Sequence, residues 1–222
     1  MIELEIFSEL EALGTEQNRK IYRRHGASDP LFGVSYANIE KLRKRIKTDH
    51  ALAVSLWDSG NHDARILATM IADPRQATDR LLDGWLKASG NPVLTDAFVK
   101  YVSQTDLARK KMEKWIKSSN EWRGRAGWTL LAYLARTDKE TSDDFFEGYI
   151  EIIERGIHSA KNRVREAMNS ALIAIGIRNS SLEKKAVAAA RRIGKVEVDH
   201  GDTNCKTPDA VEYIFKAAKR RQ

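Results

Sequence analysis

Hydrophobic residues recur at helical spacing along most of the chain, and between residues 61 and 195 they fall into four consecutive pairs of predicted helices. The pairs begin roughly 30 to 42 residues apart, which is the range of HEAT-type helical repeats. Gly, Asn, Ser, Asp or Pro residues separate them. The predicted helices cover 62–73 and 76–87, 92–103 and 105–118, 120–136 and 141–157, and 162–176 and 180–194.

No pair of this kind could bury its apolar face alone, so neighbouring pairs would have to stack to complete a core. The sequence therefore predicts an all-α fold, a HEAT-like helical-repeat superhelix (an α-solenoid crescent). At 222 residues, a single domain covering 1–222 is expected. Its predicted parts are N-terminal helices over 1–60, HEAT-like helical hairpins over 61–195, and a polar loop with a C-terminal helix over 196–222.

The flanking segments contain clear helix boundaries. A first helix is predicted over 2–13 with Gly14 as its stop, and a basic second helix over 15–26. Ser35 is placed to cap a third helix that runs to about residue 48. Near the C-terminus, Thr207 and Pro208 are expected to form the N-cap and first turn of the last helix.

The stretch from Asn91 to Arg136 combines two buried stripes with charged side chains. In its first helix, Asp96 and Lys100 share a face that lies away from the apolar residues Val93, Leu94, Ala97, Phe98, Tyr101 and Val102. A later helix has the apolar stripe Trp122, Ala126, Thr129, Leu130, Tyr133 and Leu134. A second face of that helix, which could be a working surface, presents Glu121, Arg125, Trp128 and Ala132.

Composition narrows the class of protein. No run approaches the roughly 18 to 20 apolar residues of a membrane span, so no membrane partner is expected. The N-terminal segment carries four glutamates where a signal peptide would be basic and then apolar, which predicts a cytoplasmic protein. The single cysteine, Cys205, excludes an intrachain disulfide and fits a reducing compartment.

The formal charge of +7 and the pI of about 9.4 predict an anionic partner. Nucleic acid comes first among the candidates, and a membrane surface or an acidic protein comes second. The charge alone does not select between them.

Four segments carry a resemblance to a known family. They are GVSYANIEKLRKRI (33–46), LWDSGNHDARILATMIADP (56–74), NPVLTDAF (91–98) and KWIKSSNEWRGRAGW (114–128). Together the chain resembles the DNA alkylation repair family, the AlkD-type HEAT-like-repeat DNA glycosylases, from about residue 23 to 178 in the same order and spacing. The similarity is diffuse and contains no short motif that would identify the family alone.

The resemblance implies a concave, basic surface that holds duplex DNA and an activity that releases N3- or N7-alkylated purines. It implies that Asp96 matches the family's catalytic carboxylate and that Arg125 matches an arginine beside the lesion. The chain departs from the family at Pro92 and Ser170, where the family has tryptophans that help to hold the damaged nucleotide. Trp122 or Trp128 could supply part of that surface.

These residue types suit the excision of an alkylated purine. An alkylated purine is cationic and already a good leaving group, so a fixed carboxylate at Asp96 would stabilise an oxocarbenium-like sugar and orient water. The alternative is that Asp96 only favours the helix dipole and pairs with Lys100. Likewise, Arg125 either holds a phosphate or pairs with Glu121, and Trp128 either stacks on a nucleotide or packs between repeats.

Basic and aromatic side chains near this stretch are the predicted DNA contacts. Phosphate contacts of this kind would give salt-dependent affinity without sequence preference, whereas many of the same charges could be a solvated helix face. The candidates are Arg65, Lys100, Trp122, Arg123, Trp128, Lys161, Arg163 and Arg165.

The polar segment after residue 195 contains four potential metal ligands, Asp199, His200, Asp202 and Cys205. Their spacing matches no zinc signature, so a hydrogen-bonded loop that secures the last helix is the preferred interpretation. No metal and no cofactor is expected. The sequence also lacks a phosphate-binding glycine loop, HExxH and GxSxG.

Three functional hypotheses follow from the sequence. The first is a monomeric DNA glycosylase that excises alkylated purines from duplex DNA, with Asp96 and Arg125 as its catalytic residues. The second is a DNA-binding repeat protein without enzymatic activity, which the missing tryptophans favour. The third is a helical-repeat scaffold for protein partners, in which the positive charge is incidental.

Overall fold

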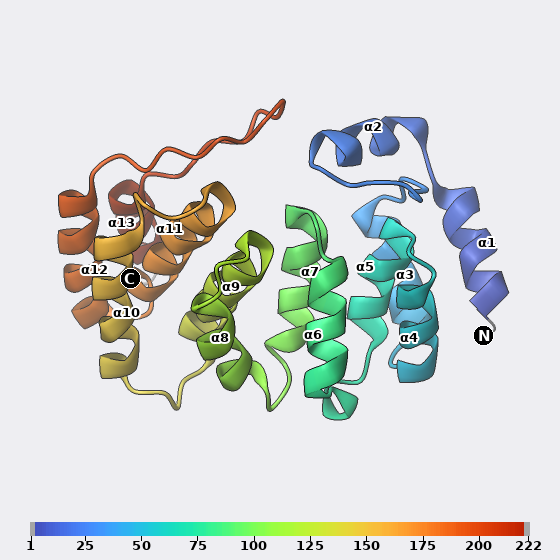
Figure 1. Ribbon diagram of the computed structural model, residues 1–222, viewed down its shortest axis with the longest axis horizontal. Helices are drawn as coiled ribbons and strands as arrows, with labels where there is room; N and C mark the ends of the chain where they lie inside the picture. Colours follow the sequence, from blue (N-terminus) through green and yellow to red (C-terminus); the bar gives the residue numbers. More distant parts are fainter. Residues whose placement is uncertain (1–2, 220–222) are drawn as a thin grey trace. The chain divides into compact units, whose positions relative to one another are not determined.

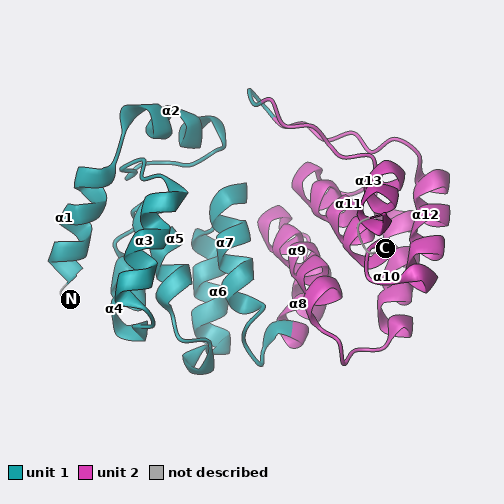
Figure 2. Ribbon diagram, turned by 180° about the vertical axis from the view of Figure 1, so that it is seen from behind, with its two compact units in different colours: residues 1–108, 201–203 teal, residues 109–200, 204–222 magenta. Residues whose placement is uncertain are grey.

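The computed structural model describes residues 3–219, which form thirteen α-helices, one short 3-10 helix and no β-strand (Figure 1). None of the helices within residues 3–219 has both the length and the apolar composition of a membrane span. The all-α class predicted from the sequence is confirmed. The chain divides into two compact units, shown in Figure 2. Unit 1 comprises residues 1–108 with 201–203, and unit 2 comprises 109–200 with 204–222.

Unit 1 is a succession of short helices in which α5 occupies the centre. Helix α5 packs against α3, α4 and α7, while α1 packs against α4 and α6 against α7. The elements are α1 (Glu3–Leu13), α2 (Glu16–Arg24), α3 (Tyr36–Ile46), α4 (His50–Asp58), α5 (His62–Ile71), η1 (Pro74–Gln76), α6 (Asp79–Ala88) and α7 (Pro92–Val102).

Aromatic packing and one buried carboxylate hold unit 1 together. The rings of Trp57 and Trp85 stack at 4.3 Å between centroids, and Phe98 of α7 packs against both. The fully buried Asp63 of α5 accepts hydrogen bonds from the backbone N–H groups of Phe32, Gly33 and Val34 at 2.7 to 3.0 Å. Three N–H donors satisfy this carboxylate and fix the loop before α3 onto α5.

Unit 2 is arranged around α11, which packs against α9, α10, α12 and α13. At the contact between α8 and α9, a Cβ on Gly127 would lie 2.5 Å from the backbone nitrogen of Ile116, so only glycine permits this approach. The helices are α8 (Ala108–Ile116), whose first residue belongs to unit 1, α9 (Glu121–Thr137), α10 (Asp143–Gly156), α11 (Asn162–Gly176), α12 (Ser180–Ile193) and α13 (Ala210–Ala218).

The four predicted helical pairs are confirmed, with ends that differ by up to three residues. The predicted start of the last helix was wrong. Asp209, not Thr207, is the N-cap of α13, and its side chain accepts a hydrogen bond from the backbone N–H of Glu212 at 2.9 Å. Pro208 instead offers its carbonyl oxygen to Asn169 of α11, so this residue fixes the loop to unit 2 rather than opening the helix.

Candidate nucleic-acid interface

Helix α7 of unit 1 carries Asp96, the predicted catalytic carboxylate. Asn91 caps the helix by accepting a hydrogen bond from the backbone N–H of Leu94, and Pro92 occupies its first turn, where a missing N–H costs nothing. Asp96 is half-buried, and Lys100, one turn later, is exposed. The buried positions are Leu94, Thr95, Phe98, Val99, Tyr101 and Val102.

This pattern corrects the predicted stripe of α7. Thr95 and Val99 are buried, whereas Val93 and Ala97 are only half-buried. Thr95 can enter the interior because its hydroxyl donates to the carbonyl oxygen of Asn91 at 2.8 Å. The prediction that Asp96 and Lys100 lie outside the buried stripe is confirmed.

Lys100 borders a recess of about 260 Å³ in unit 1. Arg43 of α3 also lines the recess and is joined to Glu40 by hydrogen bonds of 2.7 to 2.9 Å. The hydrogen bond from Arg43 lowers the pKa of Glu40, and the charge of Lys100 contributes in the same direction. The recess therefore carries two cations and one carboxylate that is ionised at neutral pH.

Helix α9 of unit 2 holds Arg125, the predicted partner of Asp96, in a different environment. The Arg125 residue is 5% exposed, and its Nη1 lies 2.6 Å from Oε2 of Glu166 in α11. Arg163 reaches the same oxygen at 3.2 Å. The Glu166 carboxylate on α11 thus pairs with two arginines that were both predicted to act on or contact DNA.

The alternative partner suggested for Arg125, Glu121, is used elsewhere. Its Oε1 accepts a hydrogen bond from the backbone N–H of Arg163 at 2.8 Å, near the N-terminus of α11. A carboxylate at this position satisfies a backbone donor that the helix itself cannot. Glu121 therefore links α9 to α11, as Arg125 does from the following turn.

The second face of α9, which the sequence suggested as a functional surface, is buried in the structure. Trp128 is 3% exposed and packs edge-on against Tyr149 of α10, with 6.0 Å between ring centroids. Ala132 is 2% exposed. The face is closed because other elements of unit 2 cover more than one side of α9, so packing is the role that the structure gives Trp128. Trp122 and Arg123, in the first turn, remain half-buried.

The other residues that were predicted to contact DNA also contact residues of their own unit. Arg65 donates from Nε to the carbonyl oxygen of Trp57 at 3.1 Å and lies over the ring of Trp57, and burial lowers its pKa. Lys161 is exposed and donates to the carbonyl oxygen of Ser119 at 2.9 Å.

Arg165 makes the most extensive set of these contacts. Its guanidinium donates to four backbone carbonyl oxygens at 2.9 to 3.2 Å, those of Ile157, His158, Ala160 and Glu197. Every carbonyl is in unit 2. The planar fork of an arginine suits this arrangement, which fixes the end of α10 and the segment after α12 against α11.

The polar segment after α12 forms hydrogen bonds, as predicted, but those of Asp199 join it to α11, whereas the prediction named the last helix. Asn162 donates to the carbonyl oxygen of Asp199 and accepts from its N–H, at 2.7 and 2.8 Å. A ring nitrogen of His200 lies 3.0 Å from the Thr207 hydroxyl. Within residues 3–219, no three Asp, Glu, His or Cys side chains cluster in a way that could hold a metal ion.

The two residues predicted to act together belong to different units, Asp96 to unit 1 and Arg125 to unit 2. Their proximity stays a prediction. Sequence reasoning missed Glu166, although it follows Arg163 by three positions, a spacing at which opposite charges meet on a helix. That signal could have identified the Arg163 pair, whereas the Arg125 pair, 41 positions apart, depends on how α9 and α11 pack.

The model of the family described as DNA alkylation repair enzyme matches residues 6–214. Two relatives are Uncharacterized protein Lin0241 of Listeria innocua and Uncharacterized protein Lmo0209 of Listeria monocytogenes. Each is 32% identical over 219 residues, which is 96% of either chain.

A solved structure is similar over 100% of this chain and 95% of its own, with a TM-score of 0.92 and 32% identity. It is described as "A new family of proteins related to the HEAT-like repeat DNA glycosylases with affinity for branched DNA structures". The predicted HEAT-like repeat class is thereby confirmed. With a match that spans nearly its whole length, the chain belongs to the DNA alkylation repair enzyme family.

Proposed function

We propose that this protein binds branched DNA through electrostatic contacts to the phosphate backbone. The observation that carries the proposal is the similarity, over the whole chain, to a structure described as having affinity for branched DNA. The net charge of +7 supports it, because a basic protein gains affinity for DNA by releasing counterions. Exposed cations such as Lys100 and Lys161 are the proposed phosphate contacts.

The buried ion pair of Arg125 favours DNA binding over base excision as the function. The guanidinium that the family resemblance places beside the lesion is buried and ion-paired with Glu166. Releasing it toward DNA would leave Glu166 without one of its two cations and would cost free energy. Pro92 and Ser170 provide no aromatic ring at the two positions where the family has tryptophans.

The proposal is tested by fluorescence anisotropy with a labelled four-way junction and a linear duplex of the same base composition. The junction should bind more tightly, and both affinities should fall steeply between about 50 and 200 mM salt. Equal affinity for the two DNAs would reject branch recognition. No binding to either at low salt would favour the protein scaffold.

Excision of N3- or N7-alkylated purines is the second candidate, and Asp96 is the observation that favours it. This carboxylate is half-buried on α7, and it is the residue that the family resemblance matches to the catalytic carboxylate. Release of 7-methylguanine or 3-methyladenine from methylated duplex by the wild type, lost in Asp96→Asn, would establish the activity. Release at the buffer rate by both proteins would remove it.

A further inference from the structure

The recess of about 260 Å³ in unit 1 combines positive charge with an exposed aromatic ring. Helices α3, α5 and α7 supply most of its lining, which includes Tyr36, Arg43, Lys100 and Gln104. The phosphate contacts proposed above use Lys100 but give no role to the ring of Tyr36. The recess therefore contains a group that binding to phosphates alone does not explain.

Positive charge exceeds negative charge at this recess. Arg43 donates to both carboxylate oxygens of Glu40 through hydrogen bonds of 2.7 to 2.9 Å. The hydrogen bond from Arg43 lowers the pKa of Glu40, and the charges of Lys44 and Lys100 lower it further. Three cations from α3 and α7 thus lie near one ionised carboxylate. The excess positive charge favours an anionic group such as a phosphate.

Tyr36 is the aromatic residue of this recess that a ligand can reach. It is the first residue of α3 and is 48% exposed. Tyr101, which also lines the recess, is 1% exposed, and its hydroxyl donates to the carbonyl oxygen of Asp73 at 3.3 Å. The Ser35 hydroxyl caps α3 by accepting a hydrogen bond from the backbone N–H of Asn38, so the helix begins here whatever side chain occupies position 36. The ring of Tyr36 is therefore not required by the fold of α3.

Cations beside an accessible aromatic ring are the combination with which proteins bind single-stranded nucleic acid. The cations attract the phosphate backbone, and the ring stacks on a base. In a paired duplex both faces of each base are covered by its neighbours, so a tyrosine can stack only where a base has lost a neighbour or its partner. Unpaired bases at the point where the arms of a branched DNA meet satisfy this condition.

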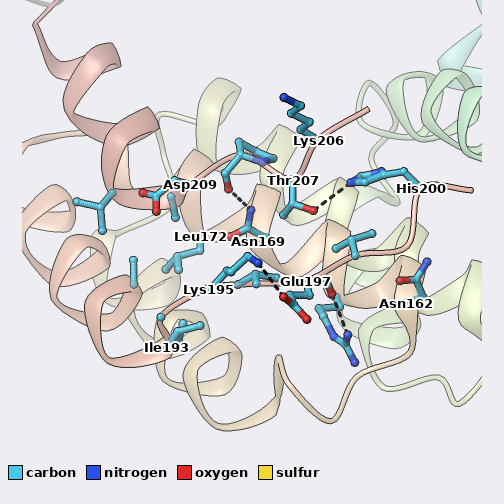
Figure 3. A pocket seen from close by; sticks show the side chains of 18 of the residues that line it. Asn162, Asn169, Leu172, Ile193, Lys195, Glu197, His200, Lys206, Thr207 and Asp209 are labelled. Atoms are coloured by element: carbon cyan, nitrogen blue, oxygen red, sulfur yellow. Dashed lines mark hydrogen bonds and ion pairs between the residues drawn. The ribbon is translucent and has the colours of Figure 1, made fainter. Parts of the chain in front are cut away.

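The larger cleft of unit 2, of about 910 Å³, does not offer the same combination (Figure 3). Its lining within the described residues contains no Phe, Tyr or Trp, and its Arg and Lys residues equal its Asp and Glu residues in number. Lys195 pairs with Glu197 at 2.8 Å, and a ring nitrogen of His200 lies 3.0 Å from the Thr207 hydroxyl. The excess of positive charge and the accessible ring thus distinguish the recess of unit 1.

We propose that the recess of unit 1 holds one unpaired nucleotide at the branch point of a DNA, with its base stacked on Tyr36 and its phosphate beside Lys100 and Arg43. The inference rests on the proposed binding of branched DNA and adds which part of that DNA unit 1 recognises. The volume lies just below the range of about 300 to 1,000 Å³ that is typical of small-molecule sites, which suits a single nucleotide. Because every base has a π-face, stacking accepts any base.

A set of four-way junctions that differ only at the branch point tests the proposal. The first junction is fully paired, and the second carries two unpaired thymidines at the branch. In fluorescence anisotropy at constant salt, the second should bind about tenfold more tightly, which is the effect of one stacked base. A third junction, abasic at the two unpaired positions, keeps the phosphates and should lose this gain. Equal binding of the first two junctions, or a gain retained by the abasic one, would overturn the proposal.

Variants of Tyr36 locate the stacked base. Tyr36→Leu keeps an apolar side chain but removes the ring, so it should bind the paired and unpaired junctions equally. Tyr36→Phe keeps the ring and should retain the gain. The matched control is Tyr213→Leu, which removes a ring of α13 in unit 2 that is 51% exposed and should also retain the gain. A folded Tyr36→Leu protein that still prefers the unpaired junction would contradict the proposal.

Photo-crosslinking of the wild-type protein gives a test that does not depend on the folding of a variant. With 5-iodouracil in place of one unpaired thymine, mass spectrometry should find the crosslink on Tyr36. A crosslink confined to other residues would place the base elsewhere and reject the recess as its site.

Binding of the fully paired junction separates these results from the fate of the proposed function. A protein that prefers this junction to linear duplex but gains nothing from unpaired thymidines loses only the recess assignment. One that binds paired junction and linear duplex equally, yet gains affinity through Tyr36, keeps the recess and loses branch recognition.

Discussion

Helices α7 and α9 each carry a residue for which the sequence predicts a catalytic role, and the two helices hold these residues in opposite ways. On α7, Asp96 is half-buried and Lys100 is exposed. On α9, Arg125 is buried and forms an ion pair with Glu166 of α11, and Trp128 and Ala132 are buried as well. Charged residues four positions apart therefore have different environments on the two helices. On α7, which is buried along one side, they lie outside the buried stripe. On α9, which is packed on several sides, the arginine forms an internal ion pair.

The largest expected effect comes from breaking the buried ion pair on α9. Arg125→Met removes the shorter of the two guanidinium contacts of the buried pair and leaves the Glu166 carboxylate with Arg163 at 3.2 Å, so the free energy of unfolding should fall by about 3 kcal/mol. Lys100→Met on α7 removes an exposed charge and should change it by less than about 0.5 kcal/mol. Urea unfolding measures both. Similar values for the two variants would contradict the contrast between the helices.

A smaller effect tests how tightly α9 is enclosed. Gly127→Ala should destabilise the protein by roughly 2 kcal/mol, because the new Cβ would lie 2.5 Å from the backbone nitrogen of Ile116 and 2.8 Å from the carbonyl carbon of Trp115. Gly148→Ala on α10 is the matched control. Apart from the neighbouring residues and backbone of α10 itself, no described atom would lie within 4 Å of the added Cβ, so this change should stabilise the helix by up to about 1 kcal/mol. A stable Gly127→Ala protein in thermal unfolding would show that α8 and α9 are not in close contact.

The smallest effect concerns DNA affinity. Lys100→Gln should lower the slope of log affinity against log salt by about one, as expected for the loss of one phosphate contact. Arg125→Met, used at a temperature where circular dichroism shows it folded, should leave that slope unchanged because its charge is already paired. Anisotropy titrations at several salt concentrations measure both slopes. A reduced slope for Arg125→Met alone would show that this arginine reaches DNA.

The helix boundaries could be predicted from the sequence because residues next to each helix end determine them. Asn91 before Pro92 marks the start of α7, and Gly194 follows the end of α12. The predicted start of α13 was wrong because Thr207 and Asp209 are both good caps. In the structure the Thr207 hydroxyl lies 3.0 Å from a ring nitrogen of His200, and Asp209 caps the helix.

The candidate site was harder to predict because its features arise from packing between distant segments. Asp96 and Lys100 lie outside the buried stripe as expected, since one helix alone determines that arrangement. The burial of Arg125 depends on Glu166, 41 residues away, and the carbonyl contacts of Arg165 depend on where the chain returns after α12. No periodicity along one helix contains that information.

The proposed recognition of branched DNA can be tested by competition between two DNAs. A labelled four-way junction bound to the protein should be displaced by unlabelled junction at a lower concentration than by linear duplex of equal length and composition, with salt held constant. We expect a clear preference for the junction. Displacement by the two competitors at the same concentration would contradict it.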